Sequence, residues 1–364
     1  MKWSPEQDAA LQAVSAWAKQ AGGPQIFRLF GYAGTGKTTL ARTIAEDVSG
    51  TVAFGAYTGK AALVLRSKGC RDATTLHSLI YRTRDAETET PTFVINNESA
   101  ASKADLIIID ECSMVDEDLG RDLLSFGTKV LVLGDPAQIP PVRGGGFFTE
   151  AEPDAMLREV HRQAADNPII RLSMTVREGG RLAVGQYGES RVIPRSQLGA
   201  STVLQADQLL VGTNKSRRAY NRRMRELLGF EHPMPEAGEK LVCLRNDKKK
   251  GLLNGGTWIV DKLHAMRGTK LRMSVIPEGE AQGKATRISV LPLMFEGTDE
   301  EIPYALRRES DEFDYGYALT VHKAQGSQWT DVVLFDESFA FRDHASRWLY
   351  TGITRASSKL TVVI

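Results

Sequence analysis

The sequence is poor in cysteine and has no long apolar segment. Its 364 residues include three cysteines, Cys70, Cys112 and Cys243, with no CxxC spacing between any two of them. An odd number without such a pair argues against a disulfide framework and against a zinc site, and it fits a reducing compartment. No apolar run would span a bilayer, and the N-terminus lacks the apolar stretch of a signal peptide. We therefore expect a cytoplasmic protein without a membrane segment.

Charge of one sign is not in excess either. The formal net charge is +1, and hydrophobic and charged residues make up 42% and 25% of the chain, as is usual for a globular protein. Two local clusters are basic: residues 214–225 contain basic side chains and no acid, and Arg245 is followed by residues 248–250, which are all lysine. Such clusters bind a phosphate backbone in some proteins and form a solvated helix face in others. Charge alone does not separate these two interpretations.

Continuous apolar runs recur along the chain. They lie at residues 26–30, 51–54, 106–109, 129–133, 209–211, 332–335 and 360–363. Runs of this kind, rather than alternating ones, are typical of parallel strands that are covered on both faces. Helical patterns separate the first of them. The sequence therefore predicts an α/β fold with two domains, each built on a parallel sheet.

Two segments break this pattern and predict insertions. Residues 84–97 are polar and rich in threonine apart from the apolar residues 92–95, which favours a small β-hairpin. Short strands separated by glycine turns between about residues 235 and 310 favour a small antiparallel barrel. The expected divisions are a first α/β domain at 1–82 and 103–150, the hairpin at 83–102, a second α/β domain at 151–234 and 311–364, and the barrel at 235–310.

The strongest motif is a glycine-rich loop. Residues 31–38 read Gly-Tyr-Ala-Gly-Thr-Gly-Lys-Thr, follow an apolar run and precede a helical pattern, which is the context that a phosphate-binding loop requires. Backbone N–H groups of such a loop and the helix dipole bind polyphosphate. We expect Lys37 to reach the β/γ-phosphates and Thr38 to hold Mg²⁺. The nucleotide-binding residues predicted here are Gly31, Ala33, Gly34, Thr35, Gly36, Lys37, Thr38 and Thr39.

Acidic and amide side chains follow two later strands. Asp110 and Glu111 come directly after the apolar run 106–109, as in a Walker B motif. We expect Asp110 to hold Mg²⁺ through water and Glu111 to polarise the attacking water. Gln138, at the end of residues 134–138, would sense the γ-phosphate or orient that water.

Eight sequence blocks occur in the order found in superfamily 1 helicases, and the chain resembles the RecD/Dda-like (1B) group of that family. The blocks are residues 31–38, 56–62, 74–78, 110–114, 134–142, 162–163, 317–328 and 350–356. They extend over nearly the whole chain. The resemblance implies an ATP-dependent DNA helicase that moves 5′ to 3′ on single-stranded DNA and separates duplex. It also implies two RecA-like domains, with the hairpin as a strand-separating pin and the barrel as an SH3-like domain.

Several residue roles follow from the resemblance alone. Arg162 and Arg355 would bring positive charge from the second domain to the transition state. Gln7 would contact adenine and set a preference for ATP, and Gly326 would also lie at the nucleotide. The residues implied to contact nucleic acid are Tyr57, Thr58, Lys60, His77, Phe93, Thr320, His322 and Gln325. Tyr57 stands where the family usually has proline, and Gly352 stands where it often has alanine. A tyrosine at the first position either stacks on a base or packs within the protein.

The resemblance also sets expectations about context. We expect a monomeric motor in a bacterial or phage-infected cell, acting at duplex junctions and meeting single-strand-binding or replication proteins. Because the chain lacks the long N-terminal extension of true RecD proteins, it favours a short motor of the Dda type. Three alternatives stay open: a translocase that strips proteins but unwinds poorly, a P-loop switch without nucleic acid, and RNA as the track, since nothing here reads a 2′-hydroxyl.

Overall fold

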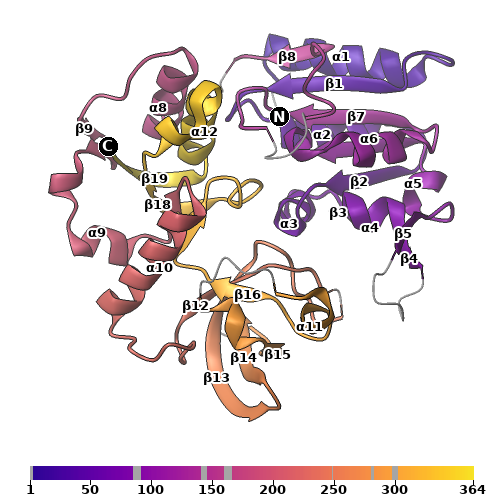
Figure 1. Ribbon diagram of the computed structural model, residues 1–364. Coiled ribbons are helices and arrows are strands. Elements are labelled where there is room, and N and C mark those ends of the chain that lie inside the picture. Colours follow the sequence, from indigo (N-terminus) through magenta and orange to yellow (C-terminus); the bar gives the residue numbers. More distant parts are fainter. Residues whose placement is uncertain are drawn as a thin grey trace. The chain divides into compact units, whose positions relative to one another are not determined.

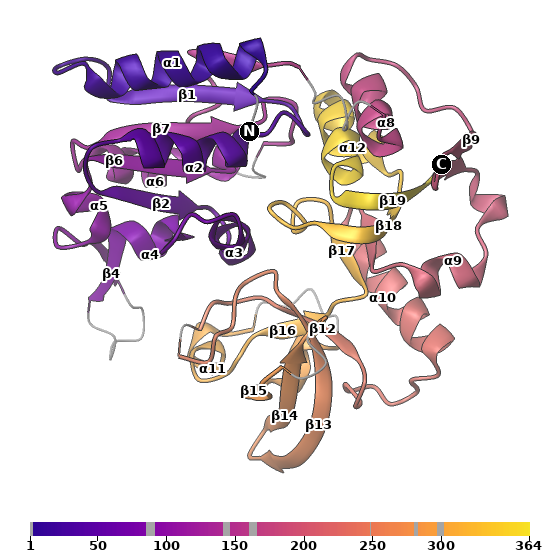
Figure 2. The same ribbon diagram turned by 180° about the vertical axis from the view of Figure 1, so that it is seen from behind.

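The computed structural model of the chain describes residues 3–84, 92–140, 146–159, 166–247, 249–279, 283–296 and 302–364. These residues form two compact units, which Figures 1 and 2 show from opposite sides. Unit 1 comprises Met1–Leu182 with Ser346–Thr354, and unit 2 comprises Ala183–Ala345 with Arg355–Ile364. Each unit contains one six-stranded sheet.

The sheet of unit 1 is parallel throughout, with the strand order β3-β2-β6-β7-β1-β8. Its strands are β1 (Ile26–Gly31), β2 (Val52–Ala56), β3 (Thr74–Thr75), β6 (Leu106–Asp110), β7 (Lys129–Gly134) and β8 (Ala155–Leu157). The four parallel strands predicted in this part of the chain are confirmed to within two residues at each end. Continuous apolar runs gave a clear signal because both faces of the sheet are buried.

Helices cover both faces of this sheet. They are α1 (Pro5–Lys19), α2 (Lys37–Asp47), α3 (Gly59–Ser67), α4 (Leu76–Ile80), α5 (Ala100–Lys103) and α6 (Glu117–Leu124), with a 3-10 turn η1 (Cys112–Met114). Unit 1 also contains α8 (Pro168–Arg177) and most of α12 (Ala345–Ile353). Successive side chains of a strand point to opposite faces. Accordingly Leu106 and Ile108 belong to the core formed with α1 and α2, whereas Ile107 and Ile109 belong to the core formed with α4 and α6.

A two-stranded antiparallel pair occupies the segment where we expect an inserted hairpin. It consists of β4 (Tyr81–Arg84) and β5 (Thr92–Ile95), with Tyr81 opposite Ile95. The connecting residues 85–91 of the expected hairpin lie outside the described residues, as do residues 141–145, which include part of the expected glycine-rich hinge.

The sheet of unit 2 has the order β17-β11-β18-β19-β10-β9, and its strands are parallel except for β9. The strands are β9 (Gly185–Tyr187), β10 (Ser190–Ile193), β11 (Gln208–Val211), β17 (Ala318–Thr320), β18 (Trp329–Phe335) and β19 (Ala356–Val363). The associated helices are α9 (Ala200–Gln205) and α10 (Asn214–Leu228), with 3-10 segments η2 (Arg195–Gln197) and η4 (Ser338–His344). The prediction of two α/β regions with parallel sheets is confirmed.

A five-stranded antiparallel sheet also belongs to unit 2, with the order β15-β14-β13-β12-β16. Its strands are β12 (Lys240–Cys243), β13 (Thr257–Arg267), β14 (Lys270–Pro277), β15 (Thr286–Val290) and β16 (Phe313–Tyr315), accompanied by η3 (Pro292–Met294) and α11 (Tyr304–Arg308). The long strands β13 and β14 lie side by side in both views (Figures 1 and 2). Residues of this sheet, such as Trp258 and Met273, share one apolar core with Leu209 of the parallel sheet.

Two strands extend beyond the boundaries expected from the sequence. β8 pairs with β1, so the first sheet continues past residue 150, and β16 pairs with β12, so the antiparallel sheet continues past residue 310. Each strand has three residues. A stretch this short shows no periodicity, so the sequence carried no signal for either strand.

Candidate functional site

The glycine-rich loop of unit 1 connects β1 to α2. Gly34 and Gly36 have φ of 81° and 83°, and Gly36 is the N-cap of α2. Residues with a Cβ rarely adopt this left-handed region, so glycine is required at both positions. The ammonium group of Lys37 donates to the carbonyl oxygens of Gly31 at 2.6 Å and Tyr32 at 3.0 Å. The lysine therefore lies against the loop beside the helix N-terminus, where a polyphosphate binds.

Thr38 and Asp110 are brought together at the end of β6. The Thr38 hydroxyl donates to Asp110 Oδ2 at 2.9 Å, and the Glu111 N–H donates to Asp110 Oδ1 at 2.9 Å. A hydroxyl next to a buried carboxylate is a donor set of the kind that Mg²⁺ prefers. The residues present therefore fit the predicted Mg²⁺.

Glu111 turns the chain sharply after β6. Its φ of 56° and ψ of 47° lie in the left-handed region, which costs a residue with a side chain about 1–3 kcal/mol. The next residue, Cys112, is fully buried, and burial raises the pKa of its thiol. A Cβ at Gly134, at the end of β7, would lie 2.6 Å from Cys112 Sγ. The end of β7 and the turn after β6 therefore pack too closely to leave room for a side chain at residue 134.

A buried hydroxyl joins two of the predicted motifs. The Tyr350 hydroxyl, from α12, donates to Asp135 Oδ2 at 2.6 Å and accepts the Ala33 N–H at 2.9 Å. Burial and the neighbouring Asp135 carboxylate raise the pKa of Tyr350, so it remains a donor. Thr351 also anchors this segment, because its hydroxyl accepts the Ile139 N–H at 2.9 Å.

Gln138 lies beside this hydrogen-bonded group. Its side chain is buried, and its Oε1 atom finds no hydrogen-bond partner among the described residues. A buried, unpaired amide oxygen is costly in a protein interior and suits a group that takes its partner from a ligand or a water. The predicted role of Gln138 in water or γ-phosphate contact stays a prediction.

Two further side chains brace the loop. Gln7 donates from Nε2 to the Thr35 carbonyl at 3.0 Å and accepts the Ser4 N–H at 3.0 Å, within a capping box at the start of α1. Its predicted contact with adenine stays a prediction. Arg177, at the end of α8, lies over the ring of Tyr32, with 3.8 Å between Cζ and the ring centroid. Sequence reasoning did not identify Arg177 or Tyr350 as site residues, because nothing local in the sequence marks their partners.

A row of four aromatic side chains, here called the aromatic row, runs from the end of β2 to the hairpin. Tyr57, His77, Tyr81 and Phe93 follow one another with ring centroids 6.2, 5.8 and 6.3 Å apart. The Tyr81 hydroxyl donates to Asp122 Oδ2 at 2.6 Å, and Phe93 is 64% exposed. Three of these residues were expected to contact nucleic acid, and Tyr81 was not.

Other predicted contacts in unit 1 have local roles in the structure. The Thr58 hydroxyl accepts the Ala61 N–H at 3.2 Å as the N-cap of α3. Lys60 lies in the first turn of the same helix and is half-buried. Thr39 follows Thr38 in the first turn of α2.

The predicted residues of unit 2 are mostly buried. Thr320 accepts the Lys323 N–H at 3.3 Å, and Gln325 is 2% exposed. His322 is half-buried, with its ring 5.4 Å from that of Phe341. Arg355 is buried and donates to the Ser327 carbonyl at 3.3 Å, next to Gly326 with φ of 71°. Arg162 lies outside the described residues.

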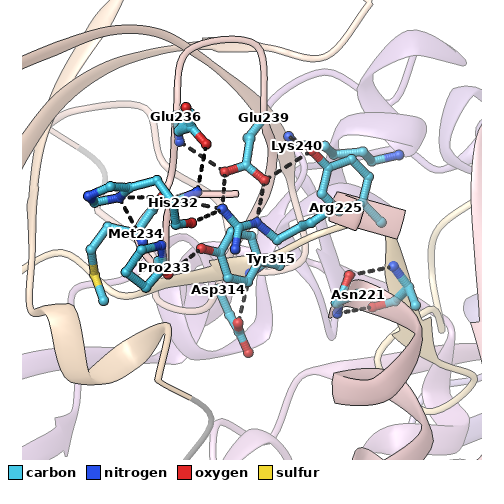
Figure 3. A network of polar contacts seen from close by, with 12 residues as sticks. Asn221, Arg225, His232, Pro233, Met234, Glu236, Glu239, Lys240, Asp314 and Tyr315 are labelled. Atoms are coloured by element: carbon cyan, nitrogen blue, oxygen red, sulfur yellow. Dashed lines mark hydrogen bonds and ion pairs between the residues drawn. The ribbon is translucent and has the colours of Figure 1, made fainter. Parts of the chain in front are cut away.

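The basic stretch 214–225 is partly structural. Arg225, on α10, donates to both oxygens of Glu239 at 2.7 and 3.0 Å, and Glu239 is 0% exposed (Figure 3). Glu239 also accepts the Glu236 N–H at 2.9 Å. Arg217 is buried against Asp314. These two arginines join α10 to the antiparallel sheet and its preceding loop, so they are not part of a free phosphate-binding face.

The chain matches two family models. One is described as an AAA domain and matches residues 2–197, and the other is described as a UvrD-like helicase C-terminal domain and matches residues 315–363. The first match covers more than half of the chain. The chain therefore belongs to this AAA-domain family, as a RecD-like member of helicase superfamily 1.

Individual relatives agree with this assignment. The chain is similar to the ATP-dependent RecD2 DNA helicase of Deinococcus radiodurans, with 28% identity over 93% of this chain and 47% of the relative. It is 33% identical to the ATP-dependent DNA helicase dda of Enterobacteria phage T4, over 41% of this chain and 37% of the relative. The chain thus spans about half or less of the length of these two relatives, at 47% and 37%.

Solved structures share the fold. The structure of Bacteroides Pif1 bound to ssDNA matches with a TM-score of 0.59 and 18% identity, over 99% of this chain and 92% of that one. Pif1 helicase from Candida albicans matches with a TM-score of 0.56 and 17% identity, over 100% and 95%. Within the described ranges, no helix has the length and apolar character needed to cross a membrane.

Proposed function

We propose that this chain is an ATP-dependent DNA helicase that moves 5′ to 3′ along single-stranded DNA and separates duplex. One relationship in unit 1 carries the proposal. The glycine-rich loop, with Lys37 and the Thr38–Asp110 pair, belongs to the same compact unit as the aromatic row that ends at the exposed Phe93. The proposal therefore puts a nucleotide site and a stacking surface for bases in one compact unit.

The nucleotide chemistry is assigned to this chain's own residues. Lys37 neutralises phosphate charge, Glu111 polarises the attacking water, and Gln138 senses the γ-phosphate or orients that water. Thr38 and Asp110 would hold Mg²⁺, which when bound neutralises charge on the β- and γ-phosphates. Gln7 is proposed to select adenine. Arg355 and Arg162 are proposed to add positive charge to the transition state, and Gly326 to border the nucleotide.

The grip on DNA is proposed to depend on phosphate contacts and base stacking, because a motor that moves along the strand cannot depend on base sequence. Tyr57, His77 and Phe93 supply aromatic surface in unit 1. We propose that residues 83–102 form the strand-separating pin and that residues 235–310 form an SH3-like domain. A monomer acting at duplex junctions, together with single-strand-binding or replication proteins, completes the proposal.

The first test is steady-state ATP hydrolysis with and without oligothymidine at low salt. A large stimulation is expected, because strand binding and hydrolysis are coupled in a motor. Lys37→Ala should abolish turnover in both conditions. Turnover that is indifferent to DNA but stimulated by oligouridine would assign an RNA track, and turnover indifferent to both would reject the helicase proposal.

A second candidate is a translocase that displaces proteins but unwinds poorly. The short hairpin favours it, since β4 and β5 have only four residues each. Replacing residues 85–91 by a glycine-serine linker separates the two functions. Loss of fork unwinding with DNA-stimulated ATPase retained would reject the translocase. Weak fork unwinding that the linker leaves unchanged, with the ATPase also unchanged, would support it.

A further inference from the structure

A strongly exposed aromatic side chain in unit 2 has no role in the site described above. Phe339, in η4, is 80% exposed, more than any other large apolar side chain among the described residues. We define residues 336–344 as the Phe339 loop; they connect β18 to α12. An isolated exposed phenylalanine on a disordered tip would mean little. The contacts of this loop show that it is fixed.

The Phe339 loop is anchored at the carboxyl ends of the parallel strands. Glu337 Oε2 accepts the N–H groups of Gly212 at 2.7 Å and Thr213 at 3.2 Å, directly after β11. The Asp336 N–H donates to the Val363 carbonyl, at the end of β19, at 2.8 Å. A Cβ at Gly212 would lie 2.8 Å from Glu337 Cβ and 3.0 Å from a ring carbon of Phe341. The loop is therefore packed closely onto this edge of the sheet.

The backbone of the loop is strained at a basic residue. Arg342 has φ of 45° and ψ of −115°, a conformation that glycine adopts easily and that side chains disfavour. Strain of this kind persists only where the surrounding structure holds it, and it is frequent at ligand-binding segments. The Arg342 and His344 side chains are exposed, and Asp343 adds one negative charge between them. The loop thus presents an aromatic ring together with the guanidinium group of Arg342.

The same loop contacts His322, one of the residues implied to touch the single strand. The Phe341 ring lies 5.4 Å from that of His322, which follows β17 at the carboxyl edge of the sheet. Ligands of open parallel sheets bind at this edge. Phe339 is two residues from Phe341 in the chain, so its exposed ring belongs to the same loop as the Phe341–His322 pair.

We propose that Phe339 stacks on a base of single-stranded DNA and that Arg342 contacts a neighbouring phosphate. The inference rests on the proposed function and adds a contact that no motif assigns. Stacking on a single strand is favoured over a duplex, whose base faces are covered, because one ring needs one exposed base face. A protein-docking surface is disfavoured, because a single ring with cationic neighbours falls short of an apolar patch.

The test is the affinity for fluorescein-labelled oligothymidine without nucleotide, measured by anisotropy. Stacking contributes about 1–3 kcal/mol per base, so Phe339→Ala should weaken binding about 5- to 150-fold. Phe339→Trp keeps the ring and should retain affinity. Val184→Ala, at another exposed apolar side chain of unit 2, is the matched control and should bind as the unchanged protein does. The fluorescence of an oligonucleotide that contains 2-aminopurine should be quenched on binding through stacking. This quenching should be lost with Phe339→Ala and kept with Phe339→Trp and Val184→Ala.

Arg342→Gly tests the cationic group without adding strain, since glycine accepts its backbone conformation. Its plot of log affinity against log salt should be shallower by about 0.7, the value for one phosphate contact to a single strand. Phe339→Ala should leave this slope unchanged. Because Arg342→Gly preserves the loop, its salt slope tests the phosphate contact even if Phe339→Ala is poorly folded.

The outcomes separate this inference from the proposed function. If the unchanged protein does not bind oligothymidine, the proposed function fails and the inference with it. If it binds, and Phe339→Ala and Arg342→Gly bind equally well with the same salt slope, the helicase proposal stands and this inference is overturned. In that case the exposed Phe339 loop would be assigned to binding a protein partner instead of DNA.

Discussion

The hydroxyl of Tyr350 donates to the Asp135 carboxylate at 2.6 Å, although 215 residues separate the two in sequence. The same hydroxyl accepts the N–H of Ala33, inside the glycine-rich loop. One buried hydroxyl therefore joins two motifs: residues 134–138, which include Gln138, and the glycine-rich loop at residues 31–38. The site depends on this hydroxyl for position, whether or not Tyr350 contacts the nucleotide.

Tyr350→Phe should destabilise the protein by about 1–3 kcal/mol, because it leaves an oxygen of Asp135 and the Ala33 N–H buried with one partner fewer. ATP turnover should also fall, since Gln138 and the loop lose a common anchor. Urea unfolding and ATPase assays measure the two effects. Tyr187→Phe removes a hydroxyl that donates to the exposed Ala183 carbonyl and should be neutral in both. Equal stability of the two variants would contradict the assignment.

Gly134→Ala should destabilise unit 1 by about 1–3 kcal/mol through overpacking, since its Cβ would lie 2.6 Å from Cys112 Sγ. Removing the thiol provides the matched test. In a double-mutant cycle, Cys112→Ala should recover a large part of the stability that Gly134→Ala loses. Additive effects of the two substitutions, measured by urea unfolding, would show that the close approach is not the cause.

The parallel strands and the glycine-rich loop were predictable, because their signals are local. A buried strand such as residues 106–109 shows its environment in its own composition, and the loop needs glycine where φ is positive. Which side chains meet across the fold was not predictable. Tyr350 and Ala33 are 317 residues apart, and no pattern in either segment marks the other.

The partners of the basic residues 214–225 were also not predictable from the sequence. A window of residues 214–225 contains no acid, so the sequence left a free cationic face open. The partners lie elsewhere: Asp314 is 97 residues from Arg217, and Glu239 is 14 residues from Arg225. Burial of an arginine requires a partner, but the sequence window does not show which arginines are buried.

Arg225→Ala should destabilise unit 2 by about 3–5 kcal/mol, because Glu239 would be left as a buried carboxylate without its ion-pair partner (Figure 3). Arg223→Ala is the matched control on the same helix. Its ion pair with Glu226 is exposed, so the expected loss is about 0–1 kcal/mol. Thermal or urea unfolding distinguishes the two. Similar losses would mean that the Arg225 pair is not the structural joint inferred here.

The free energy of unfolding should fall as the pH is lowered below about 6.5. Burial, and next the charge of His344, lower the pKa of His322 from its ordinary value of 6.5, and burial lowers that of His77. The unfolded chain then binds more protons than the folded one, so stability rises with pH across the window between the folded pKa and 6.5, and is fully present above it. In the absence of DNA, His322→Asn should make the free energy of unfolding depend less steeply on pH in this window. The double variant His322→Asn/His77→Asn should reduce the slope further. Urea unfolding at a series of pH values between 7 and 5 measures the slope, and an unchanged slope in both variants would show that other groups control it.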